Sequence, residues 1–165
     1  KNKKGLTSSF FFDIIKYKQN EGEKMHRSIR KKKPFVIISA ERFTNTIEEN
    51  EKKHNELMTQ LKKDKFSIKE VEGVYKGTVE KSIIVILNKR WLAVELGTFK
   101  NYASIFDQES ILFVDEERNA SLIFPKQVEA EKLGKFIAVP KGIAIQMSNY
   151  TFDGQDHYIC DLRGA

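Results

Sequence analysis

The sequence has few of the residues on which disulfide-bonded and zinc-binding domains depend. Its 165 residues include one cysteine, Cys160, and three histidines. A single cysteine excludes an internal disulfide framework and a cysteine-based zinc cluster. A three-histidine site would require His26, His54 and His157 to come together from three distant segments, so no metal site is expected. Cys160 lies in a late apolar segment without a nucleophile motif and is interpreted as a small core or surface residue.

Long hydrophobic runs are also missing. No apolar stretch approaches the about 20 residues that a membrane helix needs, and mean hydropathy is −0.48. The apolar stretch from Phe10 to Ile15 is too short for a signal-peptide core and contains Asp13. We therefore expect no membrane contact and no secretion by a signal peptide, and we expect the protein in the cytoplasm of a bacterial host or in a phage virion.

The common nucleotide-binding and hydrolase motifs are absent. The chain has no P-loop, no GxGxxG sequence, no HExxH sequence and no nucleophile elbow. No cofactor is expected on these grounds.

Positive charge is concentrated at the beginning of the chain. Residues 1–33 hold 11 Lys or Arg and 3 Asp or Glu, whereas residues 34–165 hold 18 and 20, so the formal charge of +6 belongs to the first segment. We predict an N-terminal arm over 1–33 and a single domain over 34–165. The basic cluster of the arm consists of Arg27, Arg30, Lys31, Lys32 and Lys33. It is either a solvated linker or a contact for nucleic acid. The arm, with its apolar segment, is also the expected contact for a protein partner or a second copy of the chain.

The stretch from Pro34 to Leu61 organises the domain. The apolar run 35–38 predicts a buried strand. Thr46 and Glu49 form a capping box that predicts a helix beginning near Ile47. Apolar and polar residues on one helical stripe are expected to face inward, namely Ile47, Asn50, His54, Leu57, Met58 and Leu61.

Polar residues follow the first strand and interrupt the helical stripe. We expect Ser39, Glu41, Arg42, Asn50 and His54 to converge near the strand end. Two interpretations stay open. The convergence is either a ligand or catalytic site, or a buried hydrogen-bond network that ties helix to strand, because buried polar groups need partners in any case.

The remaining pattern predicts an α+β fold. Strands are expected over 66–75, 79–87, 110–114 and 120–124, a helix over 91–103, and short late strands over 136–139 and 143–147. The resulting β-α-β-β-α-β-β order predicts a ferredoxin-like sandwich, with an antiparallel or mixed sheet and two helices on one face. A mixed sheet with another strand order is the alternative.

Three short patterns carry a family resemblance over residues 34–125. They are IISAER…EEN…H…L…L in 37–61, Glu80-x-Ser82 before an apolar run, and the segment 107–110 before a strand. The chain resembles a family of small α/β proteins of bacteria and tailed phages whose function is not known, although it lacks the Trp-Asn-Pro that many phage members have after the first strand. The resemblance implies an accessory protein and singles out Ser39, Arg42, Asn50, Glu80, Ser82 and Gln108.

Three functional hypotheses follow. The first is a binding module for an anionic ligand, nucleic acid or a protein, with a ligand site formed by Ser39, Arg42, Asn50, His54, Glu80, Ser82 and Gln108. The second is a virion structural or assembly component that uses its N-terminal arm. The third is an enzyme acting on a phosphate- or nucleotide-containing substrate, with His54 and Glu80 as the proton-transfer pair.

Overall fold

The computed structural model describes Ile29 and residues 31–161. Its elements follow one another as β1 (Phe35–Ser39), α2 (Ile47–Lys63), β2 (Ser67–Tyr75), β3 (Thr78–Ile86), η1 (Lys89–Trp91), α3 (Leu92–Ile105), β4 (Ile111–Val114), β5 (Asn119–Ile123), β6 (Glu131–Val139), α4 (Lys141–Ala144), β7 (Tyr150–Phe152) and β8 (His157–Asp161). No helix among these residues is long and apolar enough to cross a membrane.

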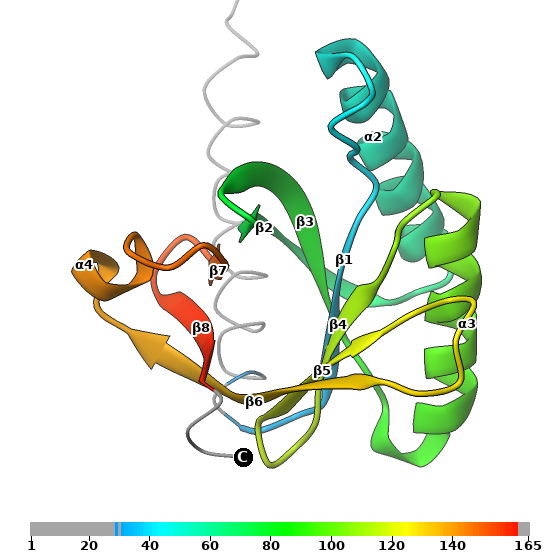
Figure 1. Ribbon diagram of the computed structural model, residues 1–165. Helices are drawn as coiled ribbons and strands as arrows, with labels where there is room; N and C mark the ends of the chain where they lie inside the picture. Colours follow the sequence, from blue (N-terminus) through cyan, green and yellow to red (C-terminus); the bar gives the residue numbers. More distant parts are fainter. Residues whose placement is uncertain (1–28, 30, 162–165) are drawn as a thin grey trace, which may run out of the picture.

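The eight strands form one closed barrel in the order β1-β3-β2-β7-β8-β6-β5-β4 (Figure 1). Every neighbouring pair is antiparallel. Among the described residues, closure gives every strand of the sheet two neighbouring strands, although the contact between β2 and β7 is limited to residues 72–74 of β2. An eight-stranded barrel is narrow enough for side chains to fill its interior.

The predicted ferredoxin-like sandwich is therefore wrong. The elements from β1 to β4 do run in the expected β-α-β-β-α-β sequence, but β5, β6, β8 and β7 continue the sheet and close it on β2. The predicted strand over 143–147 is also wrong, because that segment begins within the short helix α4. The tail supplies β7 and β8, whose hairpin pairs with β2 through Phe152, Thr151 and Tyr150. A three-residue strand such as β7 carries too little periodicity to be recognised from sequence.

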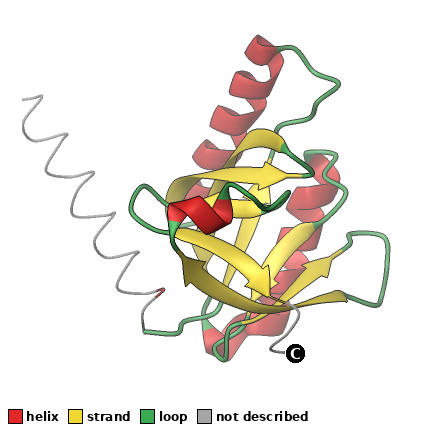
Figure 2. Ribbon diagram, turned by 60° about the vertical axis from the view of Figure 1, so that its left-hand side comes forward, coloured by secondary structure: helices red, strands yellow, loops and turns green. Residues whose placement is uncertain are grey.

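Two hydrophobic cores lie on the two sides of the sheet. Helices α2 and α3 cover one outer side of the barrel, and α4 lies on the other side (Figure 2). The outer core packs under α2 and α3 and includes Val36, Ile38, Leu57, Leu61, Ile83, Val85, Phe99 and Ala103. The inner core fills the barrel and includes Phe35, Ile37, Val71, Ile84, Val114, Phe136 and Tyr158. Alternate residues of each strand therefore belong to different cores, as period-2 geometry requires.

Helix α2 begins as predicted. The Thr46 side chain accepts the Glu49 N–H, and the Glu49 carboxylate accepts the Thr46 N–H, which completes the capping box. The predicted inward stripe is confirmed at His54, Leu57 and Leu61, which are buried. It is wrong at Ile47, which is 82% exposed. The first turn of the helix extends beyond the barrel, so the sheet offers no surface there to cover Ile47.

Candidate functional site

Polar side chains line one end of the barrel interior. Ser82 and Glu80 lie on β3, on the same face as the interior residue Ile84. Ser39 pairs with Ser82 across β1 and β3, and Gly73 pairs with Glu80 across β2 and β3. Ser39 and Ser82 are buried. Four residues of three adjacent strands therefore form a polar wall at the end of the barrel where β1 ends and the β2–β3 hairpin turns.

Gly73 makes this wall possible. A Cβ atom at this position would lie 2.9 Å from Ser82 Oγ and 3.5 Å from Glu80 Cγ. The missing side chain therefore leaves the space in which the Ser82 hydroxyl and the Glu80 side chain lie. A glycine in the middle of a strand weakens the strand and commonly marks such a close approach.

Glu80 is the most perturbed carboxyl group of the wall. Its pKa is raised from 4.5 to about 7, mainly by burial and also by the nearby Glu41 carboxylate, while a hydrogen bond from Ser82 lowers it. Among the described residues, no Lys, Arg or His nitrogen lies within 4 Å of its carboxylate. A partly buried carboxylate without a cationic partner is unfavourable for folding, and such groups concentrate at functional sites.

Glu41 is held beside this group by backbone contacts. Its Oε2 accepts the Lys81 N–H at 2.9 Å, so the carboxylate is fixed against the outer end of β3. Ser39 supports the same turn, because its hydroxyl donates to the Lys81 carbonyl at 2.8 Å and accepts the Glu41 N–H at 3.1 Å. Gln108 donates to the Glu41 carbonyl at 3.2 Å. These hydrogen bonds hold the Glu41 carboxylate close to Glu80.

Arg42 and Asn50 order the loop between β1 and α2. The Asn50 side chain accepts the Arg42 N–H at 2.9 Å and donates to the Arg42 carbonyl at 3.0 Å. The Arg42 guanidinium forms an ion pair with Asp107 at 3.1 Å and donates to the Asp107 carbonyl. Both side chains are committed to protein groups, so in this structure their role is to position the turn that carries Glu41.

His54 and Glu80 are not brought together. His54 is 2% exposed beneath α2, and its Nε2 lies 3.3 Å from Glu70 Oε2. Glu70 points to the helix-covered face of β2, because it pairs with the outer-core residue Ile83, whereas Glu80 faces the interior. His54 Nδ1 has no hydrogen-bond partner. The proton-transfer pair predicted from sequence is thus on opposite faces of the sheet.

The structure therefore gives the predicted site residues different roles. Ser39, Glu80 and Ser82 belong to the polar wall, and Gln108 contacts the adjoining Glu41 backbone. Arg42 and Asn50 order the adjacent loop, and His54 lies on the other face of the sheet. The sequence predicted that Glu41 would lie in the polar cluster at the strand end, but it did not show that Glu41 lies beside Glu80. It places Gly73 within the predicted strand 66–75, but it does not show that Gly73 lies opposite Glu80, the position that opens the wall.

Other candidate groups do not form a site. In the part of the chain that is described, no group of three or more His, Cys, Asp or Glu residues is arranged to hold a metal ion. Burial raises the pKa of the Cys160 thiol to about 11, which keeps it protonated and unreactive at neutral pH. His157 stacks on Phe152, with ring centroids 4.5 Å apart. Of the predicted basic cluster, Arg27 and Arg30 lie outside the described residues, and Lys31, Lys32 and Lys33 are exposed.

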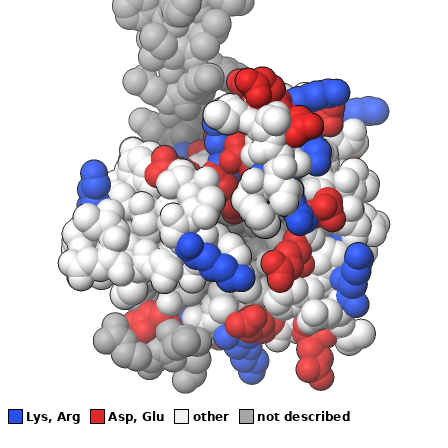
Figure 3. Space-filling model, turned by 45° about the horizontal axis from the view of Figure 1, so that its top comes forward, with Lys and Arg blue, Asp and Glu red and all other residues white. Residues whose placement is uncertain are grey.

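The arrangement is suited to a cation. Figure 3 turns this end of the molecule toward the viewer and shows acidic and basic side chains interspersed over the surface, without an extended patch of one sign. Attraction for a positive ligand must therefore come from the paired carboxylates Glu41 and Glu80 themselves. In a partly buried position their interaction with a cation is stronger than at an open surface.

Replacing Gly73 by alanine tests the geometry of the wall. We expect Gly73→Ala to displace the Ser82 hydroxyl, because the new Cβ would lie 2.9 Å from its oxygen. Loss of the hydrogen bond from Ser82 should raise the pKa of Glu80 further, and crowding should cost about 1 kcal/mol of stability. The pKa is measured by NMR titration of the Glu80 side-chain carbon. Adding Ser82→Ala removes the clash, so the double variant should regain the lost stability. A pKa unchanged in Gly73→Ala would contradict this description.

The chain is similar to a known protein family. Residues 36–161 match the S-adenosylmethionine lyase family. Comparison with curated proteins gave no significant match. The family resemblance predicted from residues 34–125 is confirmed only in part, because this region does match a protein family. The match extends it past β4 to β8 and attaches it to a family named for an activity. The leading hypothesis of a non-enzymatic binding module is therefore wrong, and the matched family agrees better with the third hypothesis, an enzyme.

Proposed function

The chain belongs to the S-adenosylmethionine lyase family, and from this premise we propose that it cleaves the sulfonium of S-adenosylmethionine at the polar wall, where Glu80 and Ser82 lie beside Glu41. The observation that carries the proposal is the partly buried Glu80 carboxylate, which has a second carboxylate beside it and no cation of the described chain within 4 Å. The family name alone would not locate the reaction within the barrel.

The chemistry of the substrate fits this site. S-adenosylmethionine carries a permanent positive charge on sulfur, which cannot be lost by deprotonation. Carboxylates at low local dielectric bind such a charge more strongly than water-exposed ones. Binding also relieves the unfavourable burial of Glu80, because a cation lowers the pKa that burial and Glu41 have raised. Binding of the sulfonium therefore offsets part of the unfavourable free energy of burying the Glu80 charge.

A lyase breaks a bond without water as the attacking group. In the reaction that we propose, the substrate's own carboxylate oxygen attacks its Cγ atom, the Cγ–S bond breaks, and the bonding electron pair goes to sulfur. The products are homoserine lactone and the neutral thioether 5′-methylthioadenosine. No proton is transferred, and the negative and positive charges of the reacting groups cancel. Such charge cancellation is favoured where water is excluded, because the ionic ground state loses its hydration.

Elimination is the less favourable way to break the same bond. It would require a base to remove a proton from Cβ of the substrate, which is attached to no activating group. A carboxylate with a pKa of about 7 is a weak base for such a proton. Glu80 therefore serves to bind and orient the sulfonium, and Glu41 serves to strengthen the field at that position.

Product analysis tests the proposal. The full chain is incubated with S-adenosylmethionine, and products are separated by liquid chromatography with mass detection. We expect 5′-methylthioadenosine and homoserine lactone in equal amounts. In H₂¹⁸O, lactone collected before its slow hydrolysis should carry no ¹⁸O. Vinylglycine would show elimination, homoserine labelled at Cγ would show hydrolysis, and no turnover would overturn the assignment of activity.

The rate should rise with pH through neutrality. Because the pKa of Glu80 is raised to about 7, its carboxylate is protonated in most molecules below that pH and ionised above it. We expect kcat/KM to fall about tenfold per pH unit below 7 and to be constant above it. In the bound complex the sulfonium favours the ionised form, so the midpoint of kcat should lie at lower pH than that of kcat/KM. Coincident midpoints would contradict contact between Glu80 and the cation.

A further inference from the structure

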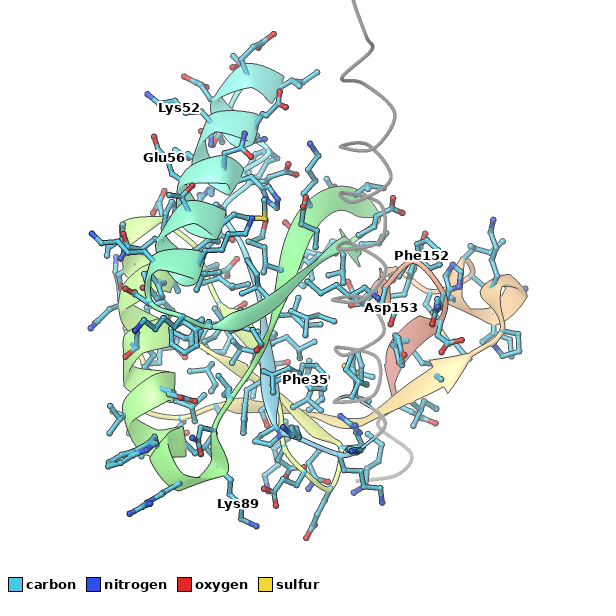
Figure 4. The ribbon with its side chains drawn as sticks, turned by 180° about the vertical axis from the view of Figure 1, so that it is seen from behind. Phe35, Lys52, Glu56, Lys89, Phe152 and Asp153 are labelled. Atoms are coloured by element: carbon cyan, nitrogen blue, oxygen red, sulfur yellow. The ribbon has the colours of Figure 1, made fainter. Side chains whose placement is uncertain are left out.

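A second feature lies at the opposite end of the barrel. A groove of about 820 Å³ runs along the beginning of β1, the beginning of β2 and the end of β3. Its charged lining residues include Lys31, Lys32, Lys33, Lys65 and Lys89. In Figure 4 the label of Lys89 marks this end, whereas Lys52 lies on the upper turns of α2. The groove is thus separate from Glu80, which lies beside the β2–β3 turn.

The groove is strongly basic. Five lysines and two glutamates line it, although residues 34–165 as a whole carry more acidic than basic side chains. Both glutamates are already engaged. Glu116 binds Lys89 at 2.8 Å, and Glu95 accepts the Asn88 N–H at 2.6 Å. No carboxylate of the described residues lies within 4 Å of the amines of Lys31, Lys32, Lys33 or Lys65. Four exposed ammonium groups therefore point to solvent along one groove.

Aromatic side chains accompany these charges. Phe66 contributes to the groove wall. Trp91 follows Lys89 and Arg90 in η1 and is 55% exposed. The Arg90 guanidinium carbon lies 5.6 Å from the centre of the Trp91 ring. Trp91 is not itself a lining residue, but it follows the lining residue Lys89 by two positions in η1. An exposed aromatic ring near a set of cations suits single-stranded nucleic acid, because phosphates bind the cations and unstacked bases stack on the ring.

We propose that this groove binds single-stranded nucleic acid without sequence preference. The lysine ammonium groups contact successive phosphates, and Trp91 stacks with a base. A single strand is favoured over a duplex because its bases are free to stack on Trp91, whereas duplex bases are paired and covered. The inference rests on the groove and is independent of the proposed lyase activity.

Two lysines of the groove have backbone angles that allow replacement by glycine. Lys32 and Lys65 have φ of 56° and 62°, in the left-handed region that glycine adopts most readily. Lys32→Gly and Lys65→Gly therefore remove positive charge from the groove without straining the backbone. Lys76 has φ of 51° and lies in the β2–β3 turn at the other end of the barrel. Lys76→Gly is thus a control with the same residue type, the same backbone region and the same change of charge.

Fluorescence anisotropy of a labelled 20-nucleotide oligo(dT) provides the test, with the full chain titrated at several salt concentrations. We expect Lys32→Gly/Lys65→Gly to weaken binding roughly tenfold or more and to reduce the slope of log K against log salt by about 1.4, at about 0.7 per phosphate contact. The control Lys52→Gln/Lys76→Gly, with the same net charge, should bind as the unmodified chain does. Trp91→Ala should weaken binding without changing the salt slope.

Several outcomes would overturn the proposal. If the control variant weakened binding as much as the groove variant, the effect would be one of net charge alone. Tighter binding of a duplex of the same length, or of poly-glutamate, than of oligo(dT) would also contradict the proposal. So would the absence of oligo(dT) binding at low salt. Lyase activity is measured on the same variants and is expected to be unchanged. The two proposals can therefore fail separately. The binding measurement tests the nucleic-acid proposal, and the turnover measurement tests the lyase proposal.

Discussion

Glu80→Gln is expected to lower kcat/KM for S-adenosylmethionine by roughly 10²–10³-fold at pH 8 and to make the folded protein more stable. Glutamine has nearly the same shape as glutamate and can still accept the hydrogen bond from Ser82. It lacks the charge that we assign to sulfonium binding. Turnover is measured by release of 5′-methylthioadenosine, and retained turnover would contradict the role of Glu80.

The gain in stability has a defined pH range. The Glu80 carboxyl group loses its proton near pH 4.5 in the unfolded chain and near pH 7 in the folded protein. Between these values the folded state holds the extra proton, so the stability of the unmodified chain falls as pH rises from 4.5 to 7 and is constant above. The Glu80→Gln variant does not show this fall in the free energy of unfolding, which is on the order of 2 kcal/mol. Urea unfolding at pH 5 and pH 8 measures the difference.

Opposite changes in activity and stability distinguish a functional carboxylate from a structural one. Replacing a structural residue would lower both the activity and the stability of the protein. Replacing a strained functional residue lowers the activity and raises the stability. Glu72→Gln is the matched control, because Glu72 lies on the neighbouring strand β2 with an exposed side chain. It should change neither quantity measurably. Glu41→Gln should lower the pKa of Glu80, since Glu41 contributes to raising it.

The sequence predicted local structure well where one element decides the pattern. The strand 35–38 and the capping box at Thr46 depend on residues within a few positions of one another, and both are present in the structure. The capping box alone locates the start of α2, because its two hydrogen bonds satisfy backbone groups of the first turn.

Features that depend on pairing between distant strands could not be predicted in this way. Gly73 opens the site only because the register places it opposite Glu80, and register is not visible in either strand alone. The polar residues Asn50 and Gln108 were expected to bind a ligand, but they bind backbone groups of the loop that carries Glu41. Sequence shows that polar groups will be buried and need partners; it does not show which partners they find.

An ion pair lies inside the barrel, close to the junction of β2 and β7. Lys69 on β2 lies with its Nζ 3.5 Å from Asp153 Oδ2, and their side chains are 16% and 0% exposed. Asp153 follows β7 (Figure 4). Its Oδ1 accepts the N–H groups of Gln155 and Asp156 at 3.0 and 2.9 Å, and Tyr158 donates to Oδ2 at 3.4 Å. Asp153 therefore joins the β7–β8 hairpin to β2, at the junction that closes the sheet.

Asp153→Ala is expected to cost about 3–5 kcal/mol of stability, because it leaves the Lys69 ammonium group in the interior without its ion-pair partner. Adding Lys69→Met replaces that cation by an apolar side chain of similar length, so the double variant should be more stable than Asp153→Ala alone. Glu116→Ala is the control, since it removes the exposed ion pair with Lys89 and should have little measurable effect. Urea unfolding followed by circular dichroism gives the three free energies. If Asp153→Ala were no more destabilising than Glu116→Ala, this ion pair would not hold the barrel closed, and strand pairing of β7 with β2 would have to suffice.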